Sequence, residues 1–118
     1  MYSDQLLDYF RNARHAGILP APARVVELEN PACGDILRLS ALVEDGLIRE
    51  AAFQVRGCTA SIACASALAE WLHGRRLEEV AREDVAVIVE ALVGGLPAES
   101  KHAARLAANA ARRLSEAG

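Results

Sequence analysis

Hydrophobic and polar positions alternate along this chain with two different periods, and each period predicts a different kind of element. Residues 3–14 place apolar side chains at helical spacing, so we predict a helix that is capped by Ser3 and ends near Gly17. The sequence Leu-Pro-Ala-Pro at residues 19–22 cannot be helical, because proline lacks an amide hydrogen and restricts the residue before it. This stretch is interpreted as an extended connector.

A period of two follows, which is typical of strands that have one packed face and one face in water. The predicted strands are residues 24–29, 35–43 and 50–56. In the second of them Arg38 and Ser40 alternate with apolar residues, so both are expected on the wet face. A Glu-Asp-Gly turn separates the second strand from the third, because Gly46 tolerates a positive φ. These strands are expected to form a small antiparallel meander.

The remaining sequence has the helical period and is rich in Ala, Leu and Val. The predicted helices are residues 59–73, a short turn at 77–81, residues 84–93 after the cap Asp84, and a last helix from about 100 to 115. A helix, three antiparallel strands and then further helices predict an α+β fold, with the helices packed on one face of the sheet. We expect residues 1–118 to form a single domain.

Composition narrows the class of function. The chain has 118 residues, of which 53% are hydrophobic, and its formal net charge is −3. A net negative charge argues against general nucleic-acid binding, because nothing offsets the repulsion of phosphates. We expect no membrane span, since no apolar run approaches the length a bilayer needs, and no signal peptide. A cytoplasmic location is therefore the expectation.

The three cysteines do not indicate a disulfide framework, because their number is odd and the expected compartment is reducing. Cys64 lies in a strongly apolar stretch and is expected to pack in the core. His15 and His73 lie near predicted helix ends and are expected at the surface.

Four other side chains are candidate metal ligands. Cys33 and Asp35 share the Asn-Pro-Ala-Cys-Gly-Asp loop, where a thiolate and a carboxylate two residues apart can reach one ion. Cys58 follows Gly57 at a predicted helix N-terminus, where free amides favour a thiolate. His102 lies near the start of the last helix. Taken singly, each also fits a plain reading as a loop cysteine, a turn-stabilising aspartate, a buried cysteine or a solvent-facing histidine. The sequence contains no CxxC pair.

Taken together, these motifs resemble the iron–sulfur cluster assembly scaffolds of the IscU type, also found as the N-terminal domain of NifU. The resemblance covers almost the whole chain. It includes the loop at residues 30–35, the Gly-Cys pair at 57–58 with the helix that runs to Trp71, the Leu-Pro pair at 96–97, and His102.

The resemblance implies a set of roles. Cys33, Asp35, Cys58 and His102 would bind iron, and zinc at the same ligands, while Cys33, Cys58 and His102 would hold a [2Fe–2S] cluster. Asp35 would keep that cluster labile. The implied partners are a cysteine desulfurase, as sulfur donor, and acceptor apo-proteins. The protein would act as a scaffold and not as an enzyme, and would be a monomer or a weak homo-oligomer.

Two departures from the family pattern leave alternatives open. Ala103 stands where the family has a third cysteine, so the chain could instead be a zinc or iron binder that has lost cluster assembly. A desulfurase-binding module without metal is a further alternative. Ala-Glu-Ser at residues 98–100 replaces the family's usual Pro-Val-Lys, so dependence on a dedicated Hsp70-type chaperone has little support in the sequence.

Overall fold

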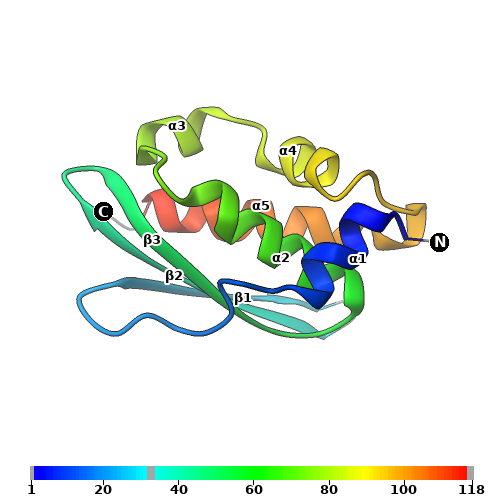
Figure 1. Ribbon diagram of the computed structural model, residues 1–118. Helices are drawn as coiled ribbons and strands as arrows, with labels where there is room; N and C mark the ends of the chain where they lie inside the picture. Colours follow the sequence, from blue (N-terminus) through cyan, green and yellow to red (C-terminus); the bar gives the residue numbers. More distant parts are fainter. Residues whose placement is uncertain (1, 32–33, 117–118) are drawn as a thin grey trace.

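The computed structural model describes residues 2–31 and 34–116, so Cys33 lies outside the described residues. The strands β1 (Arg24–Asn30), β2 (Asp35–Glu44) and β3 (Leu47–Arg56) form an antiparallel sheet in the order β1-β2-β3. The helices are α1 (Asp4–Arg11), α2 (Thr59–Leu72), α3 (Leu77–Arg82), α4 (Val85–Leu92) and α5 (Lys101–Glu116), and a short 3-10 turn, η1 (Ala98–Ser100), precedes α5. Figure 1 shows α2 and α5 lying on one face of the sheet, with α3 and α4 beyond them. The predicted α+β fold is confirmed.

The register of the sheet places the start of β2 beside the end of β3. Ile36 pairs with Arg56, so Asp35 lies next to the residues that follow β3. At the opposite end of this hairpin, Asp45 and Gly46 form the turn, with φ values of 52° and 77°. Positive φ at both central residues is the conformation that matches the twist of paired strands. The turn, together with a one-residue shift in register between Leu42 and Val43, sets which residues of β2 and β3 face each other.

The hydrophobic core lies between the sheet and the two long helices. The inner face of β2 contributes Leu37 and Leu39, which are 1% and 0% exposed. Helix α2 is buried on nearly all sides and is rich in alanine, so its backbone can approach the sheet and its neighbouring helices closely. Cys64 is fully buried in this helix, as predicted, and burial raises the pKa of its thiol to about 12.

Among the described residues, no helix combines the length and apolar character that a bilayer crossing requires.

The first helix begins where the sequence predicts and ends earlier. The Ser3 hydroxyl accepts a hydrogen bond from the Leu6 amide at 3.0 Å and donates one to the Val93 carbonyl. The helix stops at Arg11, and the chain then turns to the free edge of β3. There the Gly17 amide donates to the Phe53 carbonyl at 2.7 Å. The segment after α1 is therefore tied to the sheet.

Ser40 is buried, which corrects the expectation that it lies on the wet face with Arg38. The connector after α1 covers it, because the Leu19 amide donates to the Ser40 hydroxyl at 3.0 Å. The hydroxyl also lies 3.4 Å from the Ala52 carbonyl, to which it donates. Strand periodicity alone could not show that a connector crosses this face.

His15 and His73 are half-buried and in contact, which corrects the expectation that both are surface residues. Their ring centroids lie 4.3 Å apart. The His73 Nε2 atom accepts from the Ala51 amide at 3.4 Å, and its Nδ1 atom lies 2.8 Å from the Ala69 carbonyl. Burial, followed by the proximity of His73, lowers the pKa of His15 below its ordinary value.

Candidate metal centre

Asp35 is the first residue of β2 and has only 4% of its surface exposed. The pairing of Ile36 with Arg56 brings it against the turn that leads from β3 into α2. A buried carboxylate requires partners, because an isolated charge is costly to remove from water. The Ser61 hydroxyl, which donates to the Asp35 Oδ2 atom, is one such partner.

Cys58 is the N-cap residue of α2 and is exposed. Its extended backbone, with φ −77° and ψ 167°, turns the chain from the strand into the helix. The Sγ atom lies 3.5 Å from the Asp35 Oδ2 atom and 3.3 Å from the Ser61 hydroxyl. The thiol is therefore accessible to solvent on one side and faces polar atoms on the other.

His102 is the second residue of α5 and is half-buried. Its Nε2 atom lies 3.8 Å from the Cys58 Sγ atom and 3.6 Å from the Asp35 Oδ2 atom. The neighbouring Lys101 forms an ion pair with Glu90, which ties the start of α5 to α4. The imidazole therefore lies at a helix start that an ion pair joins to α4.

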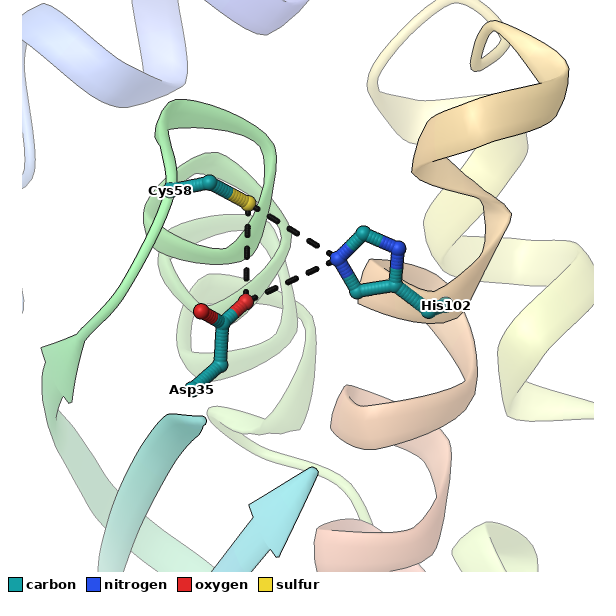
Figure 2. A group of neighbouring side chains, drawn as sticks. All are labelled: Asp35, Cys58 and His102. Atoms are coloured by element: carbon teal, nitrogen blue, oxygen red, sulfur yellow. Dashed lines mark hydrogen bonds and ion pairs between the residues drawn. The ribbon is translucent and has the colours of Figure 1, made fainter. Parts of the chain in front are cut away.

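These contacts bring together three of the predicted ligands, each from the start of a different element. The donor atoms of Asp35, Cys58 and His102 all lie within 4.8 Å of one another. Figure 2 shows the three side chains pointing toward one another from β2, the start of α2 and α5. A thiolate, an imidazole and a carboxylate are the ligand types that zinc and iron accept in proteins. The group could therefore hold a metal ion.

The fourth predicted ligand, Cys33, lies outside the described residues, but the two ends of its loop are described. The Gly34 amide donates to the Asn30 carbonyl at 2.7 Å, which closes the loop at its base. Pro31 and His102 line the same surface hollow, of about 320 Å³. The base of the loop therefore lies beside the imidazole.

Ser61 belongs to this group and was not among the residues predicted from sequence. It is 3% exposed and contacts both Asp35 and Cys58. The available signal was its place three residues after Cys58, one turn into the helix, where its side chain returns to the helix start. A serine within an apolar helix is so common that this spacing alone indicated nothing.

The fold and this cluster define a small α+β domain with a Cys, Asp and His group at one end of its sheet. The chain belongs to the family described as the NifU-like N terminal domain, whose model matches residues 1–115.

Relatives and solved structures agree with this assignment. The chain is 39% identical to the iron-sulfur cluster assembly scaffold protein IscU 1 of Archaeoglobus fulgidus, over 96% of this chain and 73% of that protein. It is also 39% identical to the scaffold protein IscU of Azotobacter vinelandii, over 92% of this chain and 87% of that protein. The N-terminal NifU-like structure from Brucella abortus superposes with a TM-score of 0.71 at 18% identity, covering 98% of this chain and 95% of that one, which supports the fold.

Proposed function

We propose that this protein is an iron–sulfur cluster assembly scaffold, which holds iron and a transient [2Fe–2S] unit and passes the unit to acceptor proteins. The observation that carries the proposal is the convergence of Asp35, Cys58 and His102 within 4.8 Å. Family membership supports it, as does the scaffold function in the names of the IscU relatives. The scaffold would hold its cargo without turning over a substrate.

We include Cys33 as the fourth ligand. It is two residues from Pro31 and two from Asp35 in the sequence. Pro31 lines the same hollow as His102, and Asp35 lies against Cys58. With Cys33 the site has two thiolates, one carboxylate and one imidazole, which suits tetrahedral zinc or iron. Mixed ligation by Cys and His also occurs in [2Fe–2S] proteins.

The four proposed ligands favour release of the bound [2Fe–2S] unit. A carboxylate is a harder ligand than a thiolate and binds iron in a cluster less firmly. Ala103, which is 1% exposed beside His102, supplies no donor atom where the resemblance places a third cysteine. We propose a cysteine desulfurase as sulfur donor and cytoplasmic apo-proteins as acceptors.

Anaerobic reconstitution tests the proposal. The protein is incubated with ferrous iron, cysteine, a cysteine desulfurase and a dithiol reductant that reduces the persulfide sulfur to sulfide, and visible absorption, iron and acid-labile sulfide are measured. We expect a chromophore with equal amounts of iron and sulfide, which Cys58→Ala and Cys33→Ala abolish. Cys64→Ala is the matched control and should retain the chromophore, because Cys64 is buried in the core. A wild-type protein without chromophore, or a Cys58→Ala variant that keeps it, contradicts the proposal.

A second candidate function is a zinc or iron binder that has lost cluster assembly. Ala103 favours it, since a site with fewer thiolates suits a single ion. Tightly bound stoichiometric zinc that survives mild chelation, with no sulfide incorporated under the conditions above, would support this alternative over the scaffold.

A further inference from the structure

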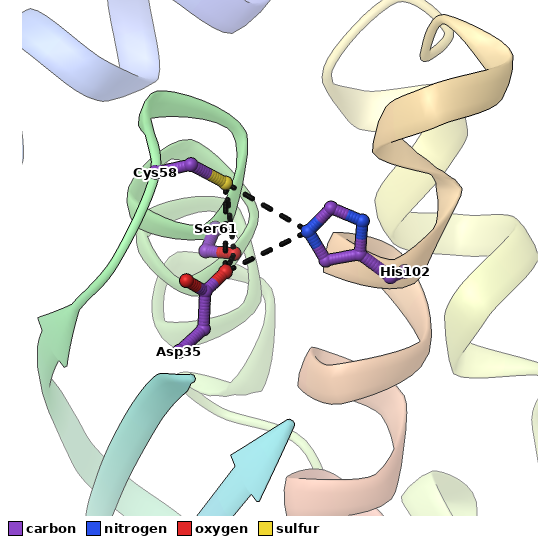
Figure 3. Close-up of polar contacts among 4 residues, drawn as sticks. All are labelled: Asp35, Cys58, Ser61 and His102. Atoms are coloured by element: carbon purple, nitrogen blue, oxygen red, sulfur yellow. Dashed lines mark hydrogen bonds and ion pairs between the residues drawn. The ribbon is translucent and has the colours of Figure 1, made fainter. Parts of the chain in front are cut away.

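Two of the residues around the Asp35 carboxylate flank the start of α2. On one side, the Ser61 hydroxyl donates to Oδ2, the same oxygen that faces Cys58 and His102. Figure 3 shows the Ser61 side chain in contact with both the carboxylate and the Cys58 sulfur. Both Ser61 and Asp35 are nearly completely buried, at 3% and 4% exposed. Water therefore competes little for this hydrogen bond.

On the other side, the carboxylate lies against the backbone of Gly57. A Cβ atom at this position would lie 2.6 Å from the Asp35 Cγ atom and 2.7 Å from its Oδ1 atom. Real side chains do not approach so closely, so only glycine leaves room for the carboxylate in this orientation. Gly57 therefore leaves room for the carboxylate, and the Ser61 hydrogen bond orients it toward the other candidate ligands.

We propose that Ser61 is a positioning residue for the metal site. This proposal rests on the function proposed above. Its hydroxyl orients Asp35 Oδ2 toward Cys58 and His102 and so increases the affinity of the site for a divalent metal ion. A carboxylate oxygen has more than one lone pair, so it can accept the Ser61 hydrogen bond and still bind a metal. Partners of this kind commonly change metal affinity by about 10- to 100-fold.

The test compares Zn²⁺ affinity, measured by competition with a chromophoric chelator, and the Co²⁺ absorption spectrum. We expect Ser61→Ala to lower Zn²⁺ affinity about tenfold or more and to alter the Co²⁺ bands that report ligand geometry. Ser66→Ala is the matched control, because Ser66 is similarly buried on the same helix and lies outside the cluster. The Zn²⁺ affinity of the Ser66→Ala variant should stay close to that of wild type.

A double-mutant cycle separates positioning from a structural role. In an Asp35→Ala background, Ser61→Ala should lower Zn²⁺ affinity much less, because only its 3.3 Å contact with the Cys58 sulfur remains. An equal loss in both backgrounds would overturn the proposal. If Ser61→Ala does not fold, Ser61→Thr and Ser61→Val replace it: the two have the same shape, and the threonine variant alone should bind like wild type.

The outcomes also distinguish this proposal from the one it rests on. If wild type binds Zn²⁺ in a Cys58-dependent way and Ser61→Ala binds equally well, the role of Ser61 is refuted and the metal site stands. If wild type binds neither Zn²⁺ nor Co²⁺, both proposals fail.

Discussion

The Oδ2 atom of Asp35 lies 3.5 Å from the Sγ atom of Cys58, although the two residues are 23 positions apart in the sequence. The β2–β3 register creates this contact, because the start of β2 lies beside the end of β3. The candidate metal centre therefore depends on correct strand pairing as well as on its ligands.

Gly57→Ala should disturb this contact directly. The added methyl group would meet the Asp35 carboxylate at 2.6–2.7 Å, so the carboxylate must move. We expect a loss of Zn²⁺ affinity of about tenfold or more and a loss of stability of about 1–3 kcal/mol from overpacking. Isothermal titration and urea unfolding would measure the two effects. In an Asp35→Ala background the stability loss should shrink; a loss of the same size there would contradict this explanation.

The two described cysteines should differ sharply in reactivity. Cys58 is exposed, whereas Cys64 is buried and its pKa is raised to about 12. Because the thiolate is the reactive form, iodoacetamide in mildly alkaline buffer should modify Cys58 in the native protein and Cys64 only after unfolding. Peptide mass spectrometry with and without urea measures this. Rapid native labelling of Cys64 would show that α2 opens readily.

Metal removal should lower the thermal midpoint, because Asp35, Cys58 and His102 join three separate elements. An ion that binds only the folded state contributes about 2.7 kcal/mol at about one hundred times its Kd. For a domain of this size that corresponds to a shift of about 10–15 °C. Differential scanning calorimetry with Zn²⁺ and with a chelator would show it. His102→Ala should lose the shift and His15→Gln should keep it.

Stability should fall in mild acid partly through His15. Burial and His73 lower the pKa of His15, so the unfolded chain binds this proton more readily than the folded protein. The contribution of neutral His15 is present above the ordinary pKa of about 6.5 and is lost as the pH falls through the folded value. Urea unfolding at neutral pH and at about pH 5 should therefore show a smaller loss for His15→Gln than for wild type. Equal losses would refute this role.

Much of the fold could be predicted from local patterns. The Ser3 cap, the Asp45–Gly46 turn and the apolar α2 each depend on neighbouring residues, so sequence alone placed them. The exposure of Ser40, His15 and His73 was predicted wrongly, because their burial depends on the segment after α1 folding back on the sheet. Long-range contacts of this kind leave no periodic signal in the chain.

The candidate site was predictable in its parts and not in its geometry. Loop and helix-start positions singled out Asp35, Cys58 and His102, and the structure brings these three together. The place of Cys33 remains a prediction. Ser61 could not be identified, because its role depends on the register between β2 and β3 and not on any motif.

Helix α5 begins at the cluster and ends far from it. Its 16 residues rise about 24 Å, and Figure 1 shows its two ends at opposite ends of the molecule. Glu116 is exposed at the distal end. A reporter group attached there would lie about 24 Å from the cluster, so the protein could be labelled without altering a single donor atom.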